Sequence, residues 1–378
     1  MFRILTIQIP FIMENNLTKK QLSRRKFVGG SAALAAISMV PFGLSSCTEQ
    51  KPAAAPAVPV KPTSNYGGVQ IGAITYSWRS MPGGVENVIR YCKDSGLTSI
   101  ELMSNDVEEY LGAPKNPLMA MFAPPKPAPQ QKQTPPPPPP PQKPGTPKTP
   151  PPQFKMTPEM EAALKKYNEE MKAWRLALPL SKFDDVKKMF DNEGIGIHIV
   201  KFSPSRWSDE EIDYAFRAAK ALGAKGVTEE IGEEAVKKLA PIAEKHGMYA
   251  IFHNHMQFAT PGFSYDPFMA VSPAVMFNFD AGHFFGSTGL HPNTIIEKYH
   301  DRIISIHLKD KTGPNTDPAN TNQVWGQGEM PLADVLKLVQ KNKWPIYCDI
   351  ELEYDIKPWS DAVKETRICN QFARQILM

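Results

Sequence analysis

Short apolar segments typical of buried strands alternate with segments of helical periodicity from residue 69 to the end of the chain. The pattern predicts strands at Val69–Tyr76, Thr98–Met103, Gly196–Phe202, Gly226–Glu230, Tyr249–His255, Val275–Asp280, Ile303–Leu308 and Ile346–Leu352. It predicts helices at Gly84–Ser95, Pro158–Asn192, Asp209–Leu222, Glu233–His246, Pro292–Tyr299, Pro331–Asn342 and Trp359–Ile376, with a weaker one at Ser264–Ser272. Strands that are each followed by a helix favour an α/β fold with a closed parallel sheet, the (β/α)8 or TIM barrel, over an open sheet.

Glycines stand where several of these helices are expected to end. Gly96, Gly223 and Gly247 each separate a helical segment from the next strand. A residue in the left-handed conformation commonly ends a helix, and glycine adopts that conformation without steric cost. We therefore expect a helix to end at each of the three.

Residues 1–47 resemble a targeting segment. The sequence SRRKFV at residues 23–28 is a twin-arginine signal pattern, and an apolar run from Gly29 to Val40 follows it. The run is shorter than the roughly 20 residues of a membrane-spanning helix. LSSC at residues 44–47 resembles a bacterial lipobox, in which Cys47 is lipidated. We expect an exported, periplasmic lipoprotein whose only membrane contact is its lipid anchor.

Two segments are rich in proline and lie outside the strand and helix pattern. Residues 48–66, rich in Ala, Pro and Lys, are typical of a flexible tether. Residues 114–156 interrupt the expected barrel, residues 67–378, and hold 18 prolines between Pro114 and Pro152. Such a segment favours disordered or polyproline II chain, here after the second strand on the active-site face. It is either a surface insertion without catalytic role or a docking segment for a partner or cell-wall layer.

Positive charge is concentrated in these outer segments. The whole chain carries +4, while residues 1–66 and residues 114–156 contribute +6 each, which leaves −8 for the remainder. Nucleic-acid binding needs clustered cations. The acidic remainder therefore argues against a nucleic-acid partner, and a small molecule is the expected one.

Ionisable side chains gather at the ends of the expected strands, where catalytic side chains of such barrels lie. They include Glu101, His198, Lys201, Glu229, Glu230, His253, His255, Asp280, His283, His307, Lys309, Asp310, Asp349, Glu351 and Glu353. Burying unpaired charges costs several kcal/mol each, so the group needs a counter-ion. Mixed carboxylate and imidazole ligands suit a divalent ion such as Mn²⁺, Zn²⁺, Co²⁺ or Fe²⁺, and Mg²⁺ is also considered.

Five motifs in order resemble the xylose isomerase-like TIM barrels, the sugar phosphate isomerase/epimerase family. They are FHNH at 252–255, NFDAGH at 278–283, HLKD at 307–310, GQGEM at 326–330 and DIELE at 349–353. The resemblance covers residues 68–113 and 157–378. It implies a divalent metal ion held by Asp280, His307 and Glu351, with His283 beside the substrate.

The fifth strand departs from this family. Epimerases of the family usually take a fourth ligand, a glutamate that also moves protons, from that strand, which here ends in His253-Asn254-His255. Either a histidine replaces the glutamate, for which His255 is our prediction, or Glu230 approaches from the fourth strand.

Such a site predicts proton abstraction next to the carbonyl of a sugar or keto-sugar, through an enediolate. Glu351 and His283 are the candidate acid–base residues, and Lys309 is expected to stabilise a developing oxyanion. The expected substrate-binding residues are Glu101, Glu230, His253, Glu353 and Trp325, whose ring can stack on a sugar. Isomerisation, epimerisation, dehydration and cleavage of a 3-keto-glycoside share this intermediate, and the residue types do not separate them.

Two other function classes stay open. A non-catalytic carbohydrate-binding lipoprotein would explain the missing glutamate of the fifth strand. An apurinic-site endonuclease shares the barrel, but the acidic charge and the export signal disfavour it. Export and the lack of a Gly-rich phosphate cradle favour an unphosphorylated sugar.

Overall fold

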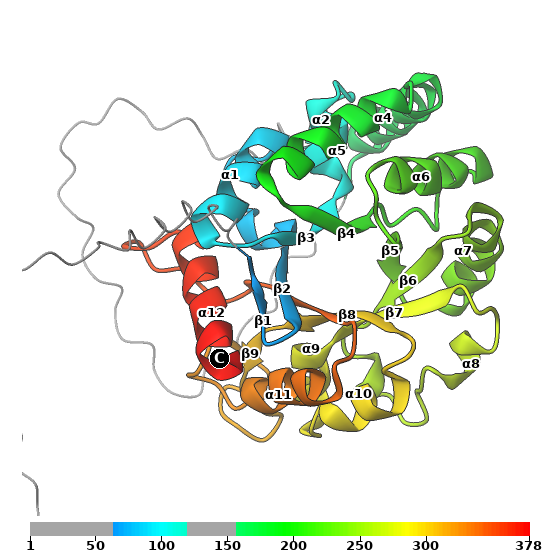
Figure 1. Cartoon of the computed structure of the whole chain (residues 1–378). Helices are drawn as coiled ribbons and strands as arrows, with labels where there is room; N and C mark the ends of the chain where they lie inside the picture. Colours follow the sequence, from blue (N-terminus) through cyan, green and yellow to red (C-terminus); the bar gives the residue numbers. More distant parts are fainter. Residues whose placement is uncertain (1–62, 119–155) are drawn as a thin grey trace, which may run out of the picture. The chain divides into compact units, whose positions relative to one another are not determined.

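The computed structural model describes residues 63–118 and 156–378 (Figure 1). The predicted signal segment with Cys47, most of the predicted tether and most of the proline-rich insertion lie outside the described residues. None of the helices within these two ranges combines the length and apolar character that crossing a bilayer requires.

Eight parallel strands form the predicted barrel, which is confirmed. They are β2 (Val69–Ile74), β3 (Ser99–Met103), β4 (Gly196–Lys201), β5 (Gly226–Glu230), β6 (Tyr249–His253), β7 (Val275–Asp280), β8 (Ile303–Leu308) and β11 (Tyr347–Ile350). Each pairs with its neighbour in the chain, and β11 pairs with β2 to close the barrel. A short strand, β1 (Asn65–Tyr66), adds antiparallel to β2, so the last residues of the predicted tether belong to the sheet.

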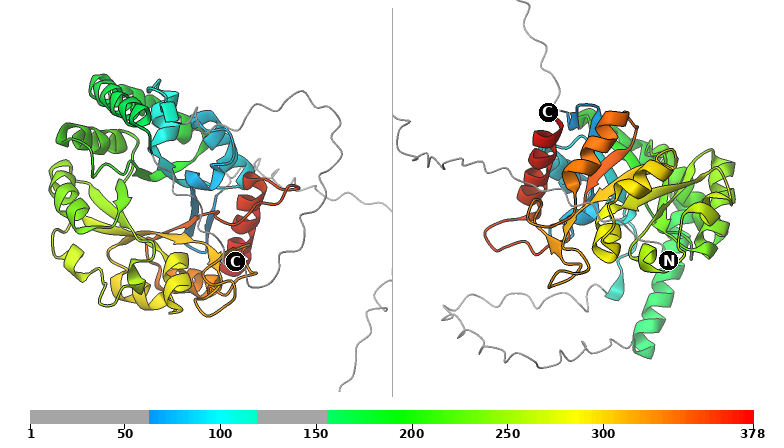
Figure 2. Two further views of the ribbon diagram at one scale, coloured as in Figure 1. Left: turned by 180° about the vertical axis from the view of Figure 1, so that it is seen from behind. Right: turned by 90° about the horizontal axis from the view of Figure 1, so that it is seen from below.

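Helices surround the barrel (Figures 1 and 2). They are α1 (Val85–Ser95), α2 (Ser104–Tyr110), α4 (Pro158–Ala177), α5 (Ser181–Glu193), α6 (Asp209–Ala221), α7 (Glu233–His246), α8 (Asp266–Met269), α9 (Ala281–Thr288), α10 (Asn293–Tyr299), α11 (Leu332–Asn342) and α12 (Ala362–Leu377). Two short 3₁₀ helices, η1 (Thr75–Trp78) and η2 (Gln257–Ala259), and a pair of short strands, β9 (Asp310–Lys311) and β10 (Asn322–Gln323), lie in the loops.

The prediction of a single helix over Pro158–Asn192 is wrong, because the helix is interrupted between α4 and α5. Leu178 is extended at φ −71° and ψ 123°. The ring of Pro179 disfavours the helical conformation for the residue before it, which explains the break. The predicted glycine ends are confirmed, with φ of +74° at Gly96, +80° at Gly223 and +61° at Gly247.

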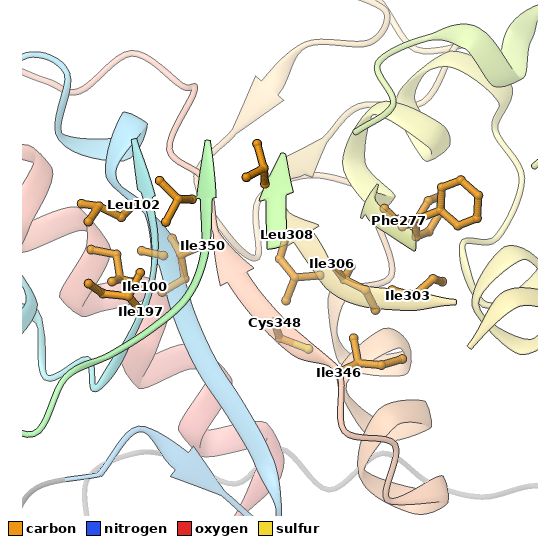
Figure 3. Close-up of a cluster of buried hydrophobic side chains, with 14 of the residues drawn as sticks. Ile100, Leu102, Ile197, Phe277, Ile303, Ile306, Leu308, Ile346, Cys348 and Ile350 are labelled. Carbon is orange, nitrogen blue, oxygen red and sulfur yellow. The ribbon is translucent and has the colours of Figure 1, made fainter. Parts of the chain in front are cut away.

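Apolar side chains pack on both faces of the barrel strands. Figure 3 shows part of the larger core, in which residues such as Ile306 and Ile350 are buried. A smaller cluster contains Ile251 and Met276. By the two-residue period of a strand, these two share a face with His253 and Asp280. The polar site described below therefore lies above an apolar layer.

Three buried thiols give a test of this packing. Burial raises the pKa of Cys92, Cys348 and Cys369, all of which are free cysteines. In a Cys47→Ser chain, we expect a disulfide reagent to label none of them at pH 8 and all of them after unfolding. The free energy of unfolding should fall as the pH rises above about 8.5, because the unfolded chain releases thiol protons that the folded chain keeps.

Denaturant titration at several pH values measures this effect. A Cys92→Ala variant, which has one buried thiol fewer, should lose part of the pH dependence. Rapid labelling of all three thiols in the native protein would contradict the prediction.

Candidate metal centre

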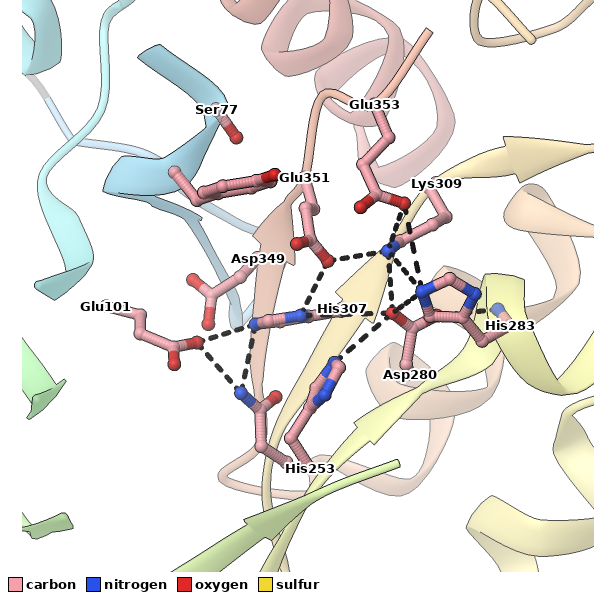
Figure 4. Close-up of polar contacts among 12 residues, drawn as sticks. Ser77, Glu101, His253, Asp280, His283, His307, Lys309, Asp349, Glu351 and Glu353 are labelled. Carbon is pink, nitrogen blue, oxygen red and sulfur yellow. Dashed lines mark hydrogen bonds and ion pairs between the residues drawn. The ribbon is translucent and has the colours of Figure 1, made fainter. Parts of the chain in front are cut away.

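Four ionisable side chains from four strands converge at one end of the barrel (Figure 4). His253, Asp280 and His307 lie on β6, β7 and β8, and Glu351 directly follows β11. All four are buried, and one ligand atom from each lies within 4.8 Å of the others. Asp280, His307 and Glu351, which are far apart in the sequence, therefore meet as the sequence predicts.

The donor atoms of this group of four are of the kinds that bind a divalent metal ion. His307 Nδ1 lies 2.8 Å from Glu351 Oε2 and makes no well-formed hydrogen bond among the described residues, while Glu351 Oε2 also lies 2.7 Å from Lys309 Nζ. His253 Nε2 lies 3.4 Å from Asp280 Oδ2. Two imidazoles and two carboxylates are a ligand set that suits first-row divalent metals. The residues present therefore fit the implied ion.

The two carboxylates of the group are ionised, as metal ligands must be. Burial alone raises the pKa of Asp280, but the charges of His283 and Lys309 outweigh it and hold that pKa well below its usual range. Burial likewise raises the pKa of Glu351, and Lys309 and His307 outweigh it there.

Lys309 places its ammonium among three carboxylates. Its Nζ lies 2.7 Å from Glu351 Oε2 and 2.8 Å from both Asp280 Oδ2 and Glu353 Oε2. Burial lowers the pKa of Lys309, but these charges outweigh it and raise the pKa above its ordinary value. Lys309 is therefore a buried cation beside this group of four side chains.

His283 stands in the first turn of α9, beside Lys309. The Asp280 Oδ1 atom accepts the His283 backbone N–H at 2.7 Å and so caps the helix. His283 Nε2 lies 3.2 Å from Lys309 Nζ. Burial and the charge of Lys309 lower the pKa of His283 to about 4 against the opposing effect of Asp280. This shift favours the neutral form of the imidazole.

Gly282, between Asp280 and His283, allows α9 to approach Lys309. A Cβ at this position would overlap Lys309 Cγ and lie 2.8 Å from the Lys309 carbonyl oxygen. We expect Gly282→Ala to lower the free energy of unfolding by about 1–3 kcal/mol, the usual cost of overpacking. Urea denaturation measures it. Gly196→Ala is the control, because a Cβ there makes only an ordinary 3.8 Å contact. Equal effects of the two would contradict the prediction.

The structure places His253, rather than His255, among the four converging side chains. Strand β6 ends at His253, so His255 lies in the following loop, with its side chain 53% exposed and Nε2 3.6 Å from Glu230 Oε2. Glu230 also accepts from Lys201 Nζ at 2.7 Å and lies 3.2 Å from His253 Nδ1. Glu230, His253 and His255 form a second group that could hold an ion.

Two of the predicted substrate-binding residues, Glu101 and Trp325, are buried in the interior. Glu101 is fully buried, with Oε2 2.6 Å from His307 Nε2, so it lies behind a ligand. Trp325 is 5% exposed and packs edge-on against Phe372 of α12, so its ring is core and does not face the mouth. Glu353, at 22% side-chain exposure, does lie beside Lys309.

Sequence reasoning missed the polar residues beneath the ligands. Thr228, Asn278 and Ser305 are fully buried and connect Glu101 to β5, β7 and β8. Asn278 stands two residues before Asp280, on the same face of β7. A polar residue at an inward position of an otherwise apolar strand was the available signal.

A family model described as the xylose isomerase-like TIM barrel matches residues 170–369. No curated protein matches the sequence. A xylose isomerase domain protein from Alicyclobacillus acidocaldarius is similar in structure, with a TM-score of 0.50 and 12% identity over 82% of this chain and 98% of that one.

Two further solved structures are similar. For a sugar phosphate isomerase/epimerase from Parabacteroides distasonis, the TM-score is 0.47 and the identity 15%, over 80% of this chain and 95% of that one. For a probable 3-DHS dehydratase from Bacillus anthracis, the TM-score is 0.49 and the identity 12%, over 80% of this chain and 98% of that one. At these identities, the similarity is one of fold.

Proposed function

This chain belongs to the family of xylose isomerase-like TIM barrels, and on that premise we propose that it is a metal-dependent isomerase or epimerase of a sugar or keto-sugar. The observation that carries the proposal is the convergence of His253, Asp280, His307 and Glu351 beside a buried lysine.

The proposed chemistry is proton abstraction next to a carbonyl. A divalent ion held by these four residues supplies, when bound, Lewis acidity toward a carbonyl and its neighbouring hydroxyl. His283 accepts the proton from the carbon at Nε2 and returns it, which an uncharged imidazole can do. The ammonium of Lys309, 3.2 Å from that nitrogen, stabilises the negative charge that develops on the substrate oxygen.

The fate of the proton decides the product. Return to the neighbouring carbon gives an isomer, and return to the opposite face gives an epimer. Loss of a substituent from the next carbon would make the same residues a dehydratase or a 3-keto-glycoside lyase.

We propose an unphosphorylated substrate. Lys201 pairs with Glu230 and Lys309 pairs with three carboxylates, so each of these two lysines already has acidic partners. The proposed periplasmic location, with the twin-arginine signal and a lipid on Cys47, supports the same choice, because sugar phosphates are mainly metabolites of the cytoplasm.

The test is solvent deuterium exchange. Protein purified without a nickel column is analysed for metals, and then keto-sugars are incubated with it in D₂O and followed by NMR. We expect a bound first-row metal and deuterium wash-in that EDTA and Glu351→Gln both abolish, while the exposed Glu234→Gln retains it. Elimination products would identify the lyase instead. A protein with neither metal nor exchange would exclude the proposed function.

A further inference from the structure

The two histidines of the metal centre face it with different nitrogens. His307 directs Nδ1 toward Glu351, and His253 directs Nε2 toward Asp280. The other nitrogen of each meets a carboxylate from outside the group of four. His307 Nε2 lies 2.6 Å from Glu101 Oε2, and His253 Nδ1 lies 3.2 Å from Glu230 Oε2.

A neutral imidazole carries one proton, so the nitrogen that donates it leaves a lone pair on the other nitrogen. We propose that Glu101 and Glu230 are positioning residues that fix the tautomers of His307 and His253, so that Nδ1 of the first and Nε2 of the second are free to bind the metal. This inference rests on the proposed metal centre and assigns the two glutamates a role other than substrate binding.

Glu101 is held as an acceptor by donors from two further strands. Thr228 donates to its Oε1 at 3.1 Å, and Asn278 donates to its Oε2 at 2.8 Å. The Asn278 amide is itself oriented, because Ser305 donates to its oxygen at 2.8 Å. An ionised carboxylate with no exposed surface needs such partners. Its Oε2 atom faces both the Asn278 amide and His307 Nε2, and Asn278 Nδ2 also lies 2.9 Å from that nitrogen.

The position of Glu101 in the barrel explains how it reaches Nε2 of His307, the ring nitrogen that does not face Glu351. β3 pairs with β2 and β4 and is not a neighbour of β8. An inward side chain of β3 therefore crosses the interior to reach His307. Figure 4 shows Glu101 and Glu351 on opposite sides of the His307 ring.

Glu230 gives His253 a weaker support. Its other oxygen accepts from Lys201 at 2.7 Å, but its side chain is 40% exposed and its contact to His253 is longer than that of Glu101 to His307. Water competes for an exposed acceptor, so we expect Glu230 to contribute less than Glu101 to metal affinity.

Zinc affinity, measured by chelator competition on the full chain, tests the proposal. Removal of a carboxylate behind a metal-binding histidine typically weakens affinity about 10–100-fold. We expect Glu101→Gln to weaken zinc affinity by a factor in that range and Glu230→Gln to weaken it by a smaller factor. The control Glu108→Gln should bind zinc with wild-type affinity. Glu108 is also buried, at 4% exposure, but is paired with Arg175, so its replacement reports a merely structural loss. Unchanged affinity in Glu101→Gln would overturn the proposal.

NMR of the zinc-loaded wild type adds a readout that requires no variant. Nitrogen-15 spectra of histidine should place a proton on Nε2 of His307 and on Nδ1 of His253. The opposite tautomer in His307 would overturn the proposal even if Glu101→Gln gave no folded protein. A wild type that binds no zinc or other divalent metal would instead contradict the metal centre, and the proposed function with it.

Discussion

Replacement of Asp280 by asparagine is expected to abolish turnover and to weaken divalent-metal binding by about a hundredfold to a few thousandfold. Asp280 Oδ2 lies 2.8 Å from Lys309 Nζ and 3.4 Å from His253 Nε2. Loss of one partner of a buried ion pair costs about 3–5 kcal/mol, which corresponds to that change in affinity. Asparagine is a good N-cap, so α9 should still begin at residue 281.

Isothermal titration with Mn²⁺ or Zn²⁺ and the deuterium exchange assay measure the two losses. Asp334→Asn is the matched control, because Asp334 has a 68% exposed side chain and pairs only with His291. If Asp280→Asn bound the metal with wild-type affinity, Asp280 would not be a ligand of the proposed centre.

Replacement of Arg175 by methionine is expected to lower the free energy of unfolding by about 3–5 kcal/mol. Arg175 joins α4 to α2 and α6. Its Nε and Nη2 lie 2.8 Å and 3.2 Å from the two oxygens of Glu108, and its Nη1 lies 3.2 Å from Glu211. Its guanidinium also stacks 3.5 Å above the ring of Trp207. Methionine would leave two buried carboxylates without a counter-charge.

Urea denaturation measures this loss. Lys172→Met, three residues from Arg175 on the same helix, breaks an exposed pair with Glu210 and should cost less than about 1 kcal/mol. Adding Glu108→Gln to Arg175→Met should recover part of the loss. The prediction would be contradicted if Arg175→Met lowered the free energy of unfolding no more than Lys172→Met does.

The barrel was predictable because its signals are local. The strands β5, β7 and β8 have the predicted bounds, and β7 and β8 are mainly apolar runs between turn residues. The family resemblance drawn from the five motifs is confirmed by the match over residues 170–369. Strand ends were less predictable, because hydrogen-bond partners decide them. β6 ends at His253, two residues earlier than the periodicity indicates.

The site was predictable in part for a topological reason. The C-terminal ends of parallel strands meet at one end of a barrel, so Asp280, His307 and Glu351 were expected to converge. The depth of each side chain could not be predicted in the same way. Glu101 on β3 contacts His307 from below the group of four, and Trp325 packs against Phe372 in the core. The depth of both side chains depends on these neighbours, which no sequence pattern specifies.

The closure of the barrel sets an order of events during synthesis. β2 begins at Val69, but the strand that completes its pairing, β11, ends at Ile350, one residue before Glu351. A ribosome must therefore release the chain as far as residue 351 before β2 is paired along both edges and all four residues of the proposed metal centre are present. Synthesis of the last barrel strand therefore precedes any binding of a metal ion at the complete centre.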